Sequence, residues 1–127
     1  MGRGVLFTGP SASGKSALAL ELIALGAVLV ADDRTLIKRE GNHLAASAPS
    51  AIAGMIEARG VGLLRLDYLP SVHISLVIDM ANEEIARLPE PREITLLDIA
   101  LPCLHKVDAS YFPAAVHAYL SGNRIEV

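Results

Sequence analysis

Short apolar runs separated by polar and glycine-rich breaks open the chain, and they predict its first elements. The run Val5–Thr8, with a glycine on each side, is typical of a short buried strand. Residues 16–25 are mainly alanine, leucine, glutamate and isoleucine, which favour a helix, and a glycine follows as its stop. Residues 28–31 form a second apolar run, closed by Asp32 and Asp33. Strand, helix and strand in this order predict a βαβ unit with parallel strands and a right-handed crossover.

The next part of the chain predicts a hairpin followed by a short helix. Residues 35–38 and 43–46 flank a Glu-Gly-Asn sequence at 40–42 that suits a tight turn between antiparallel strands. The Pro-Ser pair at the start of residues 49–58 favours a short helix over this range, and Gly60 would end it.

Further strands and a last helix are predicted in the second half. Val72–Asp79 places apolar residues at every second position, so we expect a strand with one buried face. Residues 63–66 favour another strand, and residues 94–101 favour one or two. Ser110 is the expected N-terminal cap of a final helix that reaches Leu120.

Composition and charge narrow the class of protein. The 127 residues suffice for one domain, and 52% apolar content with a mean hydropathy of +0.43 excludes intrinsic disorder. A net charge of −3 and 4% aromatic content argue against a nucleic-acid partner. No apolar stretch is long enough to span a membrane, no signal peptide is visible, and the single cysteine fits a reducing compartment. We therefore expect a soluble, cytoplasmic α/β domain.

One motif carries specific chemistry: residues 9–16 match the phosphate-binding pattern G-x-x-x-x-G-K-[ST] at every fixed position. Its glycines allow a tight loop whose backbone N–H groups point at phosphate oxygens, and the following helix presents its positive end to the same anion. Lys15 adds a charge for the β- and γ-phosphates, and the Ser16 hydroxyl suits Mg²⁺. The expected nucleotide-binding residues are Gly9, Pro10, Ser11, Ala12, Ser13, Gly14, Lys15 and Ser16.

Two further polar segments are candidates for a role at this loop. The second strand of a right-handed βαβ unit ends beside the first, so Asp32 and Asp33 would stand where Mg²⁺ or an incoming hydroxyl group meets the phosphates. The alternative is that this pair only shapes a turn or caps a helix. On the residues alone, Glu57 and Arg59 fit surface charges at the C-terminus of a helix. The four histidines lack metal-binding spacing.

Together these segments resemble the catalytic domain of HPr kinase/phosphorylase, in the short form found in proteobacteria. The resemblance covers roughly residues 4 to 80 and rests on segments in the family's order and spacing. They are residues 9–16, 19–23, 29–33, 48–49 and 57–62. The resemblance implies an α/β fold: a P-loop nucleotide-binding domain with a mixed central β-sheet flanked by helices, in a PEP-carboxykinase-like arrangement.

The resemblance also implies an activity and partners. Family members use ATP and Mg²⁺ to phosphorylate a serine of HPr, the small phosphocarrier of the phosphotransferase system. They reverse the reaction with phosphate, which attacks the phosphoserine and yields pyrophosphate. They act as hexamers, so a homo-oligomer is expected, with neither nucleic acid nor membrane as a partner.

By the same resemblance, Asp33 is the base that deprotonates the serine, with Asp32 beside it. Ser16 and Glu57 hold Mg²⁺. The residues implied in catalysis are Asp33, Lys15, Asp32 and Arg87, the last as counterpart of a catalytic arginine. The residues implied to shape the HPr-facing site are Glu57, Arg59, Gly60 and Gly62.

Departures from the family pattern bear on the extent of the domain. Family members carry a histidine on a strand upstream of the P-loop, whereas this chain begins fourteen residues before Lys15. Residues 1–127 are therefore expected to be a single catalytic domain lacking its first strand or strands. Residues 101–108 lack the arginine-rich segment that serves dephosphorylation in longer relatives, which favours kinase over phosphorylase activity. Two alternatives stay open: a nucleotide-sensing regulatory module without transferase activity, and a small P-loop kinase with another acceptor.

Overall fold

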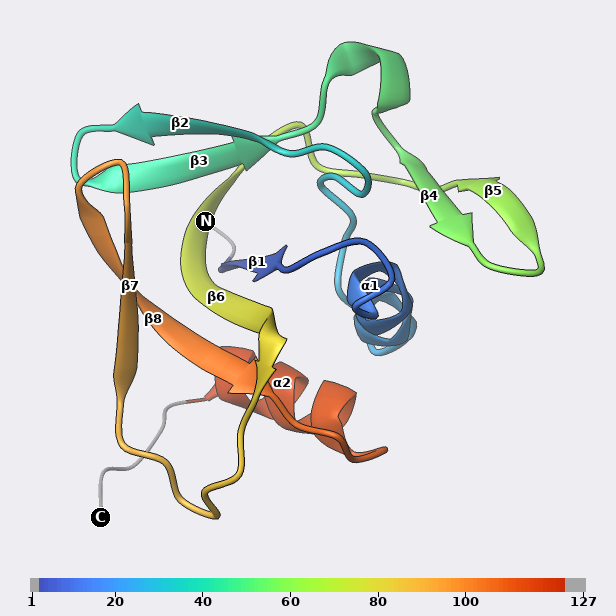
Figure 1. Cartoon of the computed structure of the whole chain (residues 1–127). Helices are drawn as coiled ribbons and strands as arrows, with labels where there is room; N and C mark the ends of the chain where they lie inside the picture. The colour runs from blue at the N-terminus through green and yellow to red at the C-terminus, as the bar shows by residue number, and fades with distance from the viewer. Residues whose placement is uncertain (1–2, 123–127) are drawn as a thin grey trace.

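The computed structural model describes residues 3–122, which form a six-stranded mixed sheet, a two-stranded sheet and two α-helices (Figure 1). The elements in chain order are β1 (Gly4–Thr8), α1 (Lys15–Ala24), β2 (Leu36–Glu40), β3 (His43–Ser47), the short 3₁₀ helix η1 (Ser50–Ile52), β4 (Met55–Ala58), β5 (Gly62–Arg65), β6 (Val72–Glu83), β7 (Arg92–Leu96), β8 (Ile99–Lys106) and α2 (Phe112–Ser121).

The long strand β6 is the centre of the main sheet because it pairs with three neighbours. Its first residues pair with β3 in antiparallel orientation. Its later residues pair in parallel with β1 along one edge and with β8 along the other. The hairpin partners β2 and β7 complete the sheet in the order β2-β3-β6-β8-β7, with β1 beside β6. The expectation of a mixed sheet flanked by helices is confirmed.

Both faces of β6 contribute to the core. Leu76 and Ile78 belong to an apolar cluster formed with α1 and α2 on one face of the sheet. Val77, between them, belongs to a second cluster on the opposite face of β6. This cluster also contains residues of the β2–β3 hairpin and of the β7–β8 hairpin. All three side chains are fully buried. The expected single buried face therefore holds only for the first half of the strand, since a central strand covered on both faces has no polar side.

The predicted βαβ unit is wrong, although its first strand and its helix are confirmed. Residues 28–31 form no strand beside β1; Leu29 makes only an isolated bridge to Tyr68. The parallel partner of β1 is β6, with Thr8 opposite Asp79. A four-residue apolar run does not specify its partner, and the longer β6 offers more backbone pairing and more buried surface.

The predicted helix over residues 49–58 is also wrong. Only η1 is helical there, and β4 follows it, with Ile56 and Ala58 buried and Glu57 between them exposed. Gly54 separates the two elements at φ 77°, and a Cβ at this position would lie 2.8 Å from the Tyr68 ring. The backbone turn at Gly54 thus ends the helical geometry and starts an extended segment with a period of two.

The remaining predictions have mixed outcomes. The hairpin on either side of residues 40–42 is confirmed as β2 and β3, and residues 94–101 divide between β7 and β8. The final helix is confirmed as α2, but Ser110 does not cap it, because the N-cap position is Tyr111 and no side chain bonds there. Neither helix within residues 3–122 is long and apolar enough to cross a membrane.

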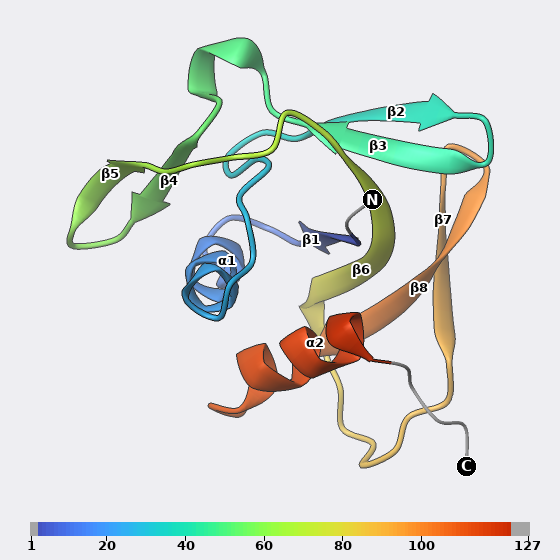
Figure 2. The same cartoon turned by 180° about the vertical axis from the view of Figure 1, so that it is seen from behind.

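The hairpin of β4 and β5 stands apart from the main sheet on the side of α1, as Figures 1 and 2 both show. It contacts the rest of the chain through α1 and through the hydrogen bond from the Glu57 N–H to Asp32, and the bridge between Leu29 and Tyr68 holds the segment that follows it. Because a two-stranded sheet has little core of its own, its position depends on these contacts.

Candidate nucleotide-binding site

The loop between β1 and α1 has the tight geometry that its sequence predicts. Three of its residues have positive φ values: Gly9 at 138°, Ala12 at 63° and Gly14 at 94°. A backbone hydrogen bond from the Ser13 N–H to the Pro10 carbonyl, 3.3 Å long, closes a turn inside the loop. Left-handed residues in such succession turn backbone N–H groups toward a common centre, as in other anion-binding loops.

The N-terminus of α1 faces this loop, and the helix itself brings no negative group there. No side chain caps the helix, and its first turn contains no acidic residue. The Lys15 ammonium group donates to the Gly9 and Pro10 carbonyls, at 2.6 and 2.8 Å. Both partners are neutral, so the lysine charge and the positive end of the helix remain available to a phosphate.

Asp32 connects the P-loop helix to the β4–β5 hairpin. Its carboxylate accepts a hydrogen bond from the Ser16 hydroxyl at 2.6 Å and another from the Glu57 backbone N–H at 2.9 Å. Asp32 is half-buried, whereas Asp33 and Glu57 are exposed beside it. Asp32 thus lies at the P-loop, as predicted, although the segment 28–31 that leads to it does not pair with β1.

These oxygen atoms fit Mg²⁺ bound together with nucleotide phosphates. In residues 3–122, no group of three or more histidine, cysteine, aspartate or glutamate side chains forms a ready-made metal cage. Mg²⁺ in kinase sites is typically held by one or two carboxylates together with phosphate oxygens and water. The Ser16 hydroxyl, the oxygen atom expected to bind Mg²⁺, lies beside the Asp32 carboxylate, and Asp32 is bonded to the backbone of Glu57.

Other predicted site residues lie on two separate segments. Arg59, Gly60 and Gly62 are in the β4–β5 hairpin, where Gly60 has φ 84° and Gly62 has φ 138°. They form a hairpin connection and not the helix terminus that the residues alone suggested. Arg87 is exposed on the β6–β7 connection, which Figures 1 and 2 place at the end of the sheet away from the β2–β3 hairpin.

The β6–β7 connection is closed at its base by an ion pair. The Arg92 guanidinium donates to both carboxylate oxygens of Glu84, at 3.0 and 3.1 Å. This pairing with Arg92 holds the pKa of Glu84 below its ordinary value. The ends of the segment that carries Arg87 are therefore fixed, while Arg87 itself is exposed.

Asp79, for which the sequence predicts no role, lies next to the P-loop. It lies opposite Thr8, the last residue of β1, and accepts hydrogen bonds from the Ala81 N–H and the Asn82 side chain at 2.8 and 2.7 Å. The bond from Asn82 is the main reason why the pKa of Asp79 lies below its ordinary value. The available signal was a buried apolar run that ends in a carboxylate, as strands beside P-loops often do.

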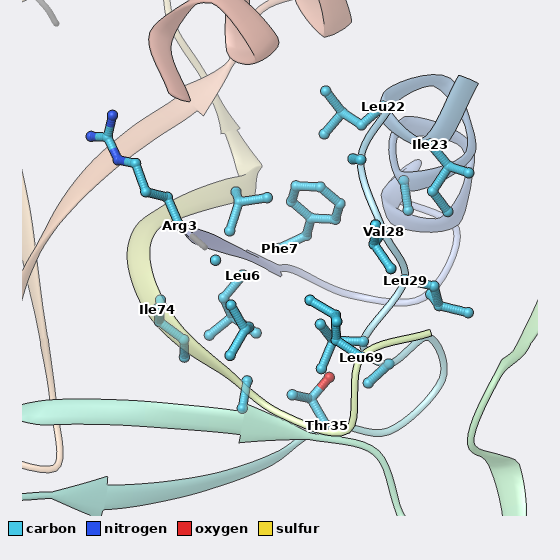
Figure 3. A pocket seen from close by; sticks show the side chains of 18 of the residues that line it. Arg3, Leu6, Phe7, Leu22, Ile23, Val28, Leu29, Thr35, Leu69 and Ile74 are labelled. Atoms are coloured by element: carbon cyan, nitrogen blue, oxygen red, sulfur yellow. The ribbon is translucent and has the colours of Figure 1, made fainter. Parts of the chain in front are cut away.

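An apolar cavity of about 310 Å³ lies along the edge of β1 that faces away from β6 (Figure 3). Leu6 and Phe7 point to opposite sides of β1, so the cavity extends above and below the plane of this strand. Val28 and Leu29 form part of its opposite wall. Lys15 and Asp32 also line it, which makes the cavity continuous with the phosphate-binding region.

A glycine-rich loop that follows a half-buried parallel strand, opens a helix and has an aspartate bonded to the first helical serine is typical of a P-loop nucleotide-binding domain. Comparison with known families gives the particular class. The family model "HPr Serine kinase C-terminal domain" matches residues 1–88. The chain therefore belongs to the HPr serine kinase C-terminal domain family.

Individual relatives agree with this assignment. The HPr kinase/phosphorylase of Geobacillus thermodenitrificans is 41% identical over 116 residues, which cover 81% of this chain and 38% of the relative. That of Alkaliphilus metalliredigens is 47% identical over 87 residues, covering 62% and 28% respectively. The chain thus spans well under half the length of these curated relatives.

A solved structure extends the similarity to most of the fold. The HPr(Ser) kinase/phosphatase from Coxiella burnetii superposes with a TM-score of 0.78 at 27% sequence identity. The match covers 94% of this chain and 86% of that one. The similarity in structure therefore includes the part of the chain beyond residue 88.

Proposed function

We propose that this chain is a protein-serine kinase that uses ATP and Mg²⁺ to phosphorylate a serine of HPr. The curated relatives are named HPr kinase/phosphorylase, and we extend that activity to this chain, including the reverse attack of phosphate on phosphoserine-HPr. The observation that carries the proposal is the double hydrogen bond of Asp32. It joins Ser16 of the P-loop to the backbone of Glu57 in the hairpin, which supports a shared role of the two segments in one site.

The residues divide the work of phosphoryl transfer among them. The N–H groups of residues 9–16 and the Lys15 ammonium bind the β- and γ-phosphates. Mg²⁺, held by Ser16 and Glu57, neutralises charge on the phosphate oxygens when it is bound. The serine Oγ forms a bond to the γ-phosphorus, the bond from that phosphorus to the bridging oxygen breaks, and ADP leaves. Asp33 accepts the serine proton.

The hydrogen bonds support the assignment of the base to Asp33. Asp32 uses both carboxylate oxygens, one for Ser16 and one for the Glu57 backbone. Asp33 is exposed and adjacent in the chain. A positioning role therefore suits Asp32, and a proton-accepting role suits Asp33.

The β4–β5 hairpin is the proposed docking surface for HPr. It carries Glu57 and Arg59 together with two exposed apolar side chains, Val61 at 76% and Leu63 at 63% exposure. Exposed apolar residues rimmed by charges are typical of protein interaction sites. Arg87, which lies apart from this hairpin, is proposed as the catalytic arginine, and a homo-oligomer as the active form.

The test is the mass of HPr, from the organism that carries this chain, after incubation with the chain and Mg-ATP. We expect one added phosphoryl group, and fragmentation should place it on a serine. Asp33→Asn should abolish the transfer while ATP affinity stays within about twofold, because the carboxylate acts on the proton and not on the nucleotide. Lys15→Ala should weaken ATP binding itself.

Asp67→Asn, at another exposed aspartate, is the matched control and should transfer at the parent rate. Transfer by Asp33→Asn at the parent rate would remove Asp33 as the base. Binding of ATP without modification of HPr would favour the nucleotide-sensing alternative. Phosphorylation of a different acceptor would favour a small P-loop kinase of another specificity.

A further inference from the structure

The end of β6 packs directly against the P-loop, at Met80 and Ala81. A Cβ placed on Gly9 would lie 3.2 Å from both the Ala81 nitrogen and the Met80 Cβ, so the two backbones are in close contact. Met80 is buried in the cluster formed with α1 and α2, and its Cε lies 3.6 Å from a Cβ placed on Gly14. A displacement of Met80 and Ala81 would therefore move the first turn of the loop or open a gap beneath it.

The hydroxyl group of Ser13 also packs against Gly9, within the loop itself. It lies 3.0 Å from a Cβ placed on Gly9, and it is buried without a hydrogen-bond partner. Gly9 is thus confined between Ser13 and the end of β6. Such close packing transmits a shift of one backbone segment to the next.

β6 bends away from the sheet where it passes under the loop. Asp79 is opposite His105 of β8, but the next paired residue, Glu83, is opposite Lys106. Residues 80–82 therefore form a bulge, a device by which strands re-aim their backbone near active sites. The Asp79 carboxylate stabilises this bulge, because it accepts hydrogen bonds from both the Ala81 N–H and the Asn82 side-chain amide.

We infer that Asp79 is a positioning residue for the P-loop: through Ala81 and Asn82 it holds the bulge against Gly9 and so keeps the phosphate-binding N–H groups in place. This inference rests on the proposed use of ATP by the P-loop. This role requires no contact of Asp79 with phosphate or metal. Its effect belongs to nucleotide affinity and not to the transfer step.

The test compares substitutions that break the two hydrogen bonds with one that keeps them. Asp79→Ala removes both acceptors and should raise the Kd and the KM for Mg-ATP about tenfold, with kcat at saturating ATP within about twofold of the parent. Asp79→Asn keeps an oxygen for the Ala81 N–H and an amide for the Asn82 oxygen, so affinity should stay within about threefold. Asp67→Ala is the control at an exposed aspartate away from the bulge.

A reciprocal exchange makes the test specific for the hydrogen bonds. Asn82→Asp places two carboxylates against each other and should weaken ATP binding. The double variant Asp79→Asn, Asn82→Asp restores a donor and an acceptor and should recover most of the affinity. All variants are compared at a temperature at which circular dichroism shows each to be folded.

Amide hydrogen exchange at Ser13 gives a readout that needs no nucleotide. The Ser13 N–H bonds to the Pro10 carbonyl, and it should exchange faster in Asp79→Ala and at the parent rate in Asp79→Asn. If the parent chain binds no ATP, the proposed function fails, and the exchange rates alone decide the positioning role. Parent-like exchange and affinity in Asp79→Ala, or equal losses in Asp79→Asn and Asp79→Ala, would overturn the inference.

Discussion

Ala12 adopts a left-handed backbone conformation inside the P-loop, with φ at 63°. This conformation is unfavourable for any residue with a Cβ, whereas glycine adopts it without penalty. Ala12→Gly should therefore raise the free energy of unfolding by about 0.5–1 kcal/mol, after allowance for the greater freedom of glycine in the unfolded chain. The corresponding rise in Tm is roughly 2–5 °C by calorimetry.

The matched control for Ala12 is Ala19 in the middle of α1, where the backbone is helical. Ala19→Gly should lower stability by about 1 kcal/mol, because glycine disfavours a helix interior. Equal losses of Tm in both variants would show that the φ of Ala12 carries no penalty. ATP affinity should change little in Ala12→Gly, since the loop keeps the same backbone shape.

At this same scale, the predicted site residues show how much the sequence discloses. The P-loop pattern alone was enough to place Lys15 and Ser16, because each fixed position has a physical function that requires that residue type. Asp32 was also placed correctly, although the βαβ argument for it was wrong. Asp79 was missed because its importance arises from a bulge and from contact with Gly9, and neither has a signature in a single sequence.

At the scale of elements, the turn between β7 and β8 lacks the residues that best suit its backbone. Leu97 and Asp98 form a two-residue connection with φ values of 46° and 64°, positions that usually carry asparagine and glycine. The double variant Leu97→Asn, Asp98→Gly should raise the free energy of unfolding by about 1–2 kcal/mol. The expected readout is a higher urea midpoint with an unchanged m-value.

The β2–β3 turn provides the control in the opposite direction. Gly41 there has φ 62° and open space around its Cα, so Gly41→Ala adds strain without a clash. It should cost about 1 kcal/mol. If the β7–β8 variant leaves the urea midpoint unchanged while Gly41→Ala lowers it, backbone strain at Leu97 and Asp98 does not reduce the free energy of unfolding.

These two turns also explain where element prediction succeeded and where it stopped. The β2–β3 hairpin was predictable because Gly41 and Asn42 are typical turn residues. Residues 94–101 stayed ambiguous between one strand and two because no glycine or asparagine marks the turn and Asp98 alone is a weak turn signal. The segment that forms β4 was assigned to the helix class since a short apolar run fits a helix or a strand equally well, and only the close approach of Gly54 to Tyr68 decides it.

For the whole molecule, the sheet has an edge that its own described residues leave open. Within residues 3–122, β1 pairs with β6 alone, and the apolar cavity of about 310 Å³ runs along its other edge. The cavity has walls above and below β1, as a slot for an additional strand requires (Figure 3). We propose that this edge accepts an additional strand, which would pair with β1.

Adding such a strand should stabilise the molecule. A chain extended at its N-terminus by a strand of alternating valine and threonine, joined through an Asn-Gly turn, should unfold at a higher temperature and bind less of the hydrophobic dye ANS. The outward amides of β1 should then exchange more slowly, because they gain hydrogen-bond partners. The control has the same composition with the alternation shifted by one residue, which turns the apolar face of the added strand to the opposite side. Equal Tm values and equal exchange rates for the two extended chains would mean that the cavity does not select a strand with a defined face. A gain limited to the first chain would show that the open edge of β1, the strand that leads into the P-loop, accepts a strand with its apolar face on a defined side.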